Sequence, residues 1–154
     1  MVNFLVGTHA ALGELGVLAF LWCMVELLNP TVPRVKRATI AAIIGTLFIL
    51  ASWTTGGYYY LNIYGSNIKP IINEGSQSWA HQIITETKEH VFLFLPFIAF
   101  LTTSLLMHHK NRLIAESALR HAIIHLCALV VIIGLLMAGM GYIISSAFRS
   151  SLGG

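Results

Sequence analysis

Four long apolar runs divide this chain, and short polar segments separate them. None of the runs alternates apolar and polar residues with the period of two that a strand would need, so each run predicts a helix. About 20 mostly apolar residues are enough to cross the hydrocarbon core of a bilayer. We therefore predict an all-α integral membrane protein, with a single transmembrane domain built as a four-helix bundle. The helices are expected at about residues 4–28, 38–58, 80–108 and 119–147, with an outer loop at 59–79.

The third run is the weakest of the four. Its purely apolar part begins only at Val91, so the helix reaches spanning length only if the polar turns before Val91 belong to it. Such a helix carries Glu86, Glu89 and His90 near the lipid interface. Pro96 is expected to kink it, because proline lacks the backbone donor of a helix and clashes with the preceding turn.

The basic residues predict how the chain is oriented. Six of the nine lysines and arginines follow the first and third runs, and positive residues near membrane helices favour the cytoplasmic side. We therefore expect an up-down-up-down bundle with both termini outside. Most tyrosines and tryptophans then fall at the outer level, as in an interfacial belt, although Tyr58, Tyr59 and Tyr60 could instead line a site. The six basic residues are Arg34, Lys36, Arg37, Lys110, Arg112 and Arg120.

Composition supports a lipid bilayer as the main environment. The chain has 154 residues, of which 56% are hydrophobic and only 10% are charged, whereas a soluble domain has about 25% charged residues. The net charge of +3 does not indicate nucleic-acid binding, because no basic helix is interleaved with aromatic residues. The first run lacks the positive segment of a signal peptide and is too long for one. No organelle-targeting segment is recognisable, which favours a prokaryotic plasma membrane and a multi-pass protein.

Two histidines fall at matching depths on two helices that run in the same direction. His9 lies 20 residues before Asn29, and His90 lies 18 residues before His108, at the inner ends of their helices. At 1.5 Å per residue, both lie about 27–30 Å above the inner boundary, close to the outer surface. The first and third helices of such a bundle are diagonal neighbours. The sequence therefore favours His9 and His90 as two metal ligands, suited to the axial positions of one haem iron.

Two glycines share the helix face of His9. Gly13 and Gly16 follow it at spacings of four and seven residues, and glycines there would let a bulky planar cofactor approach the backbone. Glycines in membrane helices also serve close packing between helices, and both interpretations stay open.

The inner half of the bundle and the carboxylates give further candidates. His125 lies about one turn inside the fourth run and is a candidate metal ligand for an inner site. Glu14, Glu86 and Glu89 are candidates for orienting a ligand histidine or for accepting a proton. A di-iron carboxylate site is disfavoured, because Glu86 and His90 lack the Glu-x-x-His spacing. Cys23 and Cys127 are expected to be small buried residues without a disulfide, in a reducing compartment.

With His9, His90 and His125 on three helices, and with Gly13 and Gly16 beside His9, the chain resembles the small four-helix membrane cytochromes of the b type. The resemblance extends over the whole chain in architecture and involves no sequence motif. It implies one non-covalent haem b, with a second possible, and electron transfer between a quinol pool and a partner. The family often pairs the ligands of both haems across two helices, whereas His125 has no clear partner here.

We therefore expect a membrane electron-transfer protein or subunit that exchanges electrons with a quinol pool or a partner redox subunit. As a small chain, it is expected to work with partner membrane subunits or as a homo-oligomer, and not as an enzyme by itself. Two alternatives stay open. One is a cofactor-free accessory or structural subunit of a larger complex. The other is a metal or proton transporter, which the apolar second helix disfavours.

Overall fold

The computed structural model describes residues 2–153, and each regular element in that range is a helix. Four helical stretches are long and apolar enough to cross a membrane: Phe4–Leu28, Val32–Glu74, Ala80–His109 and Ser117–Gly153. The predictions of an all-α chain and of four helices suited to spanning a membrane are therefore confirmed. The elements are α1 (Val2–Leu28), α2 (Val32–Tyr59), η1 (Tyr60–Ile68), α3 (Lys69–Glu74), η2 (Ala80–Thr85), α4 (Glu86–Phe92), α5 (Phe94–His109) and α6 (Ser117–Gly153).

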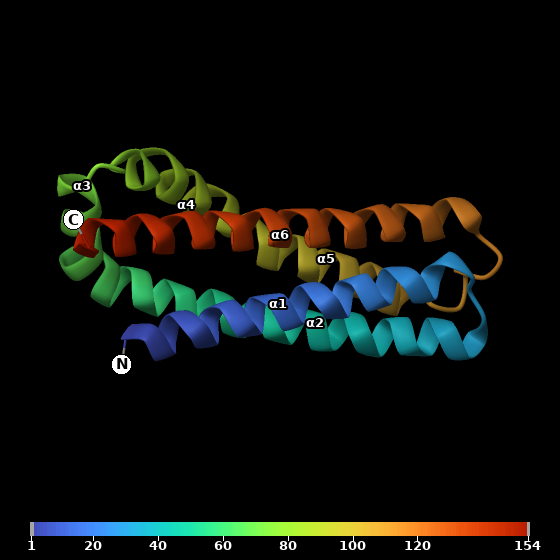
Figure 1. Cartoon of the computed structure of the whole chain (residues 1–154). Helices are drawn as coiled ribbons and strands as arrows, with labels where there is room; N and C mark the ends of the chain where they lie inside the picture. The colour runs from blue at the N-terminus through green and yellow to red at the C-terminus, as the bar shows by residue number, and fades with distance from the viewer. Residues whose placement is uncertain (1, 154) are drawn as a thin grey trace.

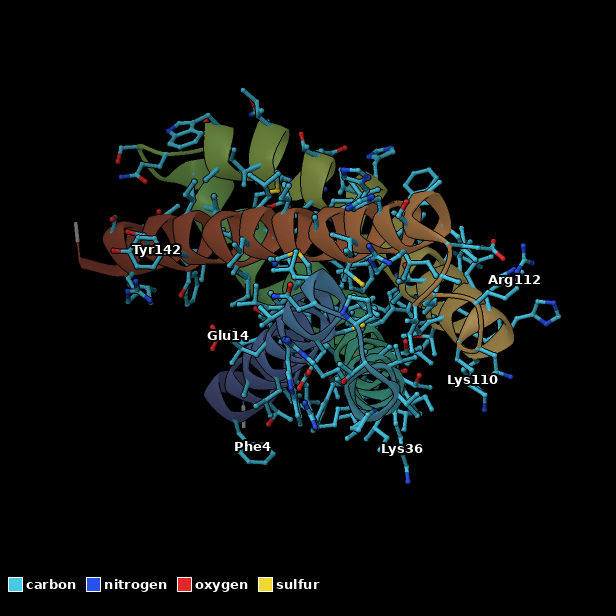
Figure 2. All side chains as sticks on the ribbon, turned by 90° about the vertical axis from the view of Figure 1, so that its right-hand side faces the viewer. Phe4, Glu14, Lys36, Lys110, Arg112 and Tyr142 are labelled. Carbon is cyan, nitrogen blue, oxygen red and sulfur yellow. The ribbon has the colours of Figure 1, made fainter. Side chains whose placement is uncertain are left out.

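The long helices lie side by side along one axis (Figure 1). The two ends of the chain and α3 lie at one end of the bundle, which we call the terminal end. The short connections 29–31 and 110–116 lie at the opposite end, which we call the loop end. Figure 2, seen from the loop end, shows the basic side chains of Lys36, Lys110 and Arg112 extending outward.

The segment 59–79, expected as an outer loop, is helical as far as Glu74. The second spanning helix continues from α2 through η1 into α3, and η1 and η2 have the wider hydrogen-bond pattern of a π-helix. The third spanning helix begins at Ala80. It is interrupted at Leu93, between α4 and α5, three residues before Pro96. The missing N–H of this proline removes the helical partner of a carbonyl one turn earlier, which explains the interruption.

The loop half of the bundle has a closely packed apolar core. Glycines let α1 and α2 approach there: a Cβ added at Gly16 would lie 2.7 Å from Ile49 Cγ1, and one at Gly45 would lie 2.8 Å from Phe20 Cδ2. Gly16 therefore serves helix packing, the second of the two interpretations above. The largest side chains of this core are fully buried and come from α1, α5, α6 and the 110–116 connection: Phe20, Leu27, Leu106, Leu113 and Ile123.

Polar contacts join helices within this half. The hydroxyls of Thr46 on α2 and Thr103 on α5 lie 2.8 Å apart and are buried. The Thr103 hydroxyl also donates to the Ala42 carbonyl at 3.1 Å. The sulfurs of Cys23 and Cys127 lie 3.6 Å apart between α1 and α6, and both residues are free and buried.

Glu26 connects the loop-end segments of α1 and α2. Its carboxylate accepts hydrogen bonds from Arg34 Nε at 2.9 Å, from Arg37 Nε at 2.7 Å and from Trp22 Nε1 at 3.1 Å. At the same end, Arg112 and Glu116 form an exposed ion pair, and the guanidinium lowers the pKa of the Glu116 carboxyl below its ordinary value. These pairs make the loop end a charged surface.

Candidate functional site at the terminal end

A cavity of about 1260 Å³ lies inside the terminal half of the bundle. Its wall comes from α1, α2, η1, α5 and α6, with further residues from η2 and α4. The residues that line it fall in 6–18, 49–68, 85–96 and 134–148, so the wall does not extend into the packed core of the loop half. Most of the wall is apolar, which suits a ligand with a large apolar body.

Aromatic rings form much of the cavity wall. All five tyrosines of the chain line the cavity. The three consecutive tyrosines are therefore placed as in the alternative in which they line a site. Two ring pairs are stacked: Tyr60 with Tyr64, at 5.5 Å between centroids, and Trp53 with Phe92, at 5.9 Å. The five are Tyr58, Tyr59, Tyr60, Tyr64 and Tyr142.

His9 lies on the cavity wall in a fixed orientation. Its Nδ1 lies 2.8 Å from the Ser52 carbonyl oxygen and 3.0 Å from Ser52 Oγ, and this hydroxyl donates to the His9 carbonyl at 2.8 Å. Because the Ser52 carbonyl can only accept, the Nδ1 of His9 carries the proton. Nε2 then keeps its lone pair, and it has no hydrogen bond to any described residue. Gly56 makes room for the ring, since a Cβ there would lie 2.6 Å from His9 Cε1.

The structure brings only some of the predicted site residues together. Gly13, Glu14 and Glu89 line the same cavity as His9. The side chain of Glu14 extends from α1 on the side of the molecule where Tyr142 extends from α6 (Figure 2). A Cβ added at Gly13 would lie 3.1 Å from the Oγ of Ser52, so this glycine gives space to the residue that holds His9.

Besides Gly16, three predicted residues, all ionisable, lie outside the cavity wall. His90 is exposed on α4, and its Nδ1 lies 2.7 Å from the carbonyl oxygen of Glu86 one turn earlier. Glu86 is exposed as well. His125 is exposed on α6 in the loop half. Among the residues that the structure describes, no group of three or more His, Cys, Asp or Glu side chains is arranged to hold a metal ion.

A buried polar network beside the cavity was not predicted. The Tyr64 hydroxyl lies 3.0 Å from His81 Nδ1 and 3.0 Å from Thr85 Oγ1, and all three residues are buried. His81 Nε2 lies 4.0 Å from Oε1 of the exposed Glu86. Tyr64 and His81 are 17 residues apart across the turn at Gly75, so no helical spacing in the sequence connects them.

Lys88 and Glu89 bring charge to the apolar wall. Both line the cavity, and Nζ of Lys88 lies only 3.1 Å from where a Cβ at Gly141 would be. Oε1 of Glu89 is buried and has no hydrogen-bond partner. The site therefore combines an oriented imidazole, an ammonium group and a carboxylate in a wide cavity. No protein-family model, curated protein or solved structure matches this chain.

Proposed function

We propose that this protein is a membrane electron-transfer protein or subunit that holds a non-covalent haem b in the terminal-end cavity and exchanges electrons with a quinol pool or a partner redox subunit. The observation that carries the proposal is the setting of His9. Its imidazole lies on a large apolar cavity and is held through Nδ1 by the Ser52 carbonyl. A backbone carbonyl on one ring nitrogen is a usual way of orienting a histidine that binds metal through the other nitrogen.

The cavity suits a large planar cofactor. Ligand pockets commonly measure about 300–1,000 Å³, and this one has about 1260 Å³. The stacked rings of Trp53 and Phe92 and the mainly apolar wall would contact an apolar ring system and exclude water from it. When bound, haem b supplies one-electron redox chemistry. The chain would contribute His9 as an axial ligand, with Ser52 as the residue that orients it.

Two residues are candidates for the second axial ligand. His90, the partner predicted from helix depth, has its Nδ1 engaged by the Glu86 carbonyl and its Nε2 free. Its side chain is exposed, so ligation would require α4 to turn towards the cavity. Met137 is buried and lines the cavity, and a methionine thioether is an established haem ligand. We propose a single haem, because His125 is exposed on α6 and lies outside the wall of the terminal-end cavity.

We further propose that the loop end faces the cytoplasm, with the helices alternating up and down and both termini outside. The support is the distribution of charge: six of the nine lysines and arginines lie at or near the loop end. The haem would then lie near the outer face of a prokaryotic plasma membrane. A transporter would need a polar path onward to the loop end. Phe20, Leu106 and Ile123 are fully buried there, which argues against transport.

The test is the visible spectrum of protein purified in detergent, reduced with dithionite and compared with the oxidised form. A sharp b-type α band is expected, and it should disappear in His9→Ala. The matched control is His121→Ala, which changes an exposed histidine at the loop end and should leave the band unchanged. Comparing His90→Ala with Met137→Leu identifies the second ligand. A protein without any Soret band would overturn the proposal and favour an accessory subunit without a cofactor.

A further inference from the structure

Lys88 is a cation in the cavity wall for which no described residue supplies a counter-ion. Its Nζ makes no hydrogen bond or ion pair with any residue that the structure describes. The ion pairs found there involve other residues: Glu26 with Arg34 and Arg37, His81 with Glu86, and Arg112 with Glu116. A charged side chain within a membrane protein is costly unless something pairs with it, so an ionisable residue at this depth by default suggests function.

The packing around Lys88 leaves space for its ammonium group inside the bundle. Gly141 on α6 faces it, and a Cβ at that position would lie 3.1 Å from Nζ. The lysine stem therefore reaches across from α4 to α6 within the cavity instead of extending into solvent. Glycine at position 141 keeps this space open for the ammonium group and for whatever binds it.

The other charges of the cavity restrict what Lys88 can bind. Glu14 and Glu89 also line the cavity, and neither of them pairs with Lys88. Two carboxylates would repel a compact dianion such as phosphate, whose whole charge would lie close to them. A carboxylate on a large apolar body fits better, because a single negative charge can pair with the ammonium group while the apolar body contacts the wall.

We propose that Lys88 binds the carboxylate of an amphiphilic ligand whose apolar body occupies the terminal-end cavity. Two sources share this chemistry: a propionate of haem, and a fatty acid from the membrane. The haem case rests on the function proposed above, whereas the fatty-acid case does not. Because hydrogen bonds to charged groups are the stronger ones, loss of the ammonium group should weaken binding about tenfold or more.

The test compares acids with their esters on purified protein in uncharged detergent. Protohaem and its dimethyl ester form one arm, and doxyl-labelled stearic acid and its methyl ester form the other. All four probes quench tryptophan fluorescence, and Trp53 lines the cavity. The variants are Lys88→Met, which removes the charge, and Lys88→Arg, which keeps it. Lys69→Met is the matched control, since Lys69 is exposed and outside the wall. Unchanged thermal unfolding will show that each variant is folded.

We expect at least one acid to bind about tenfold more tightly than its ester to the native protein. Lys88→Met should abolish this preference, and Lys88→Arg and Lys69→Met should retain it. Binding of stearic acid but not protohaem would support the Lys88 site and overturn the haem proposal. Binding of protohaem that depends on both Lys88 and His9 would support both. Equal binding of acid and ester, the same preference in Lys88→Met, or no binding of any probe would overturn the inference.

Discussion

Gly56→Ala tests the arrangement that holds His9 in place. The added Cβ would lie 2.6 Å from both Cε1 and Nδ1 of His9. Non-bonded carbon atoms prefer separations of about 3.5–4.0 Å, so the imidazole has to move by about 1 Å. The bond of 2.8 Å between Nδ1 and the Ser52 carbonyl would then lengthen beyond hydrogen-bond range. We therefore expect this variant to lose the orientation of His9.

The matched control for this substitution is Gly57→Ala. A Cβ at Gly57 would have nothing within 4 Å, and both glycines lie in α2. Alanine is better than glycine in a helix by about 1 kcal/mol, and this gain is common to both variants. Overpacking typically costs about 1–3 kcal/mol. The free energy of unfolding of Gly56→Ala should therefore be lower than that of Gly57→Ala by about 1–3 kcal/mol.

The assay is unfolding of purified protein by SDS in mixed micelles, followed by circular dichroism. The haem content of the same samples gives a second measurement, and Gly56→Ala should reduce it more than Gly57→Ala, because both glycines line the cavity but only the first substitution displaces His9. Equal free energies of unfolding for the two variants would show that the His9 ring moves without an energetic penalty. That result would refute the prediction that Gly56 is needed to hold the ring in place.

Three further predictions concern other buried contacts. Tyr64→Phe should lower the free energy of unfolding by about 1–3 kcal/mol, because the buried His81 Nδ1 loses its hydrogen-bond partner and the Thr85 hydroxyl keeps only its bond to the Ala80 carbonyl. An unchanged SDS-unfolding midpoint would contradict this. Thr46→Val and Thr103→Val should each cost about 0.6 kcal/mol, and at most about 1.7 kcal/mol, as interhelical hydrogen bonds in membranes do. Their effects should be less than additive, because the two hydroxyls bond each other. Cys23 and Cys127, whose sulfurs lie 3.6 Å apart, should form a disulfide when the protein is treated with a membrane-permeant oxidant. After cleavage in the 110–116 connection, the disulfide should hold the two fragments together on a non-reducing gel. The absence of this cross-link in folded protein would count against the packing of α1 on α6.

The sequence predicted four helices suited to spanning a membrane, but it did not show how far the helix extends into residues 59–79. Long apolar runs identify spanning helices because a bilayer demands both length and apolar composition. Residues 59–79 contain Gly65, Pro70 and Gly75 and have the composition of a loop. They are nevertheless helical to Glu74, because Ile68 and Ile72 pack on the end of α6 near Ala147. Such a contact between distant segments leaves no local pattern.

The candidate site was also predicted only in part from the sequence. Depth along the helices identified His9 and the carboxylates of the cavity wall, since helical rise is a local property. Depth carries no information on the direction in which a side chain points. His9 turns towards Ser52 on α2, whereas His90, at a similar depth, is exposed on α4. The same limit applies to Lys88, which enters the cavity because Gly141 lies opposite.

The sequence by itself therefore determined the class of protein, the number of spanning helices and the end at which charge accumulates, since bilayer thickness and the cost of burying charge act on each segment alone. Tertiary structure decided which ionisable groups share one space. It opened a cavity where the terminal halves of the helices enclose an aromatic-lined space, and it filled the loop half with Phe20, Leu106 and Ile123. The physical reason is that a cavity depends on the distance between whole helices. That distance is set by the glycines and large side chains that different helices place at the same depth.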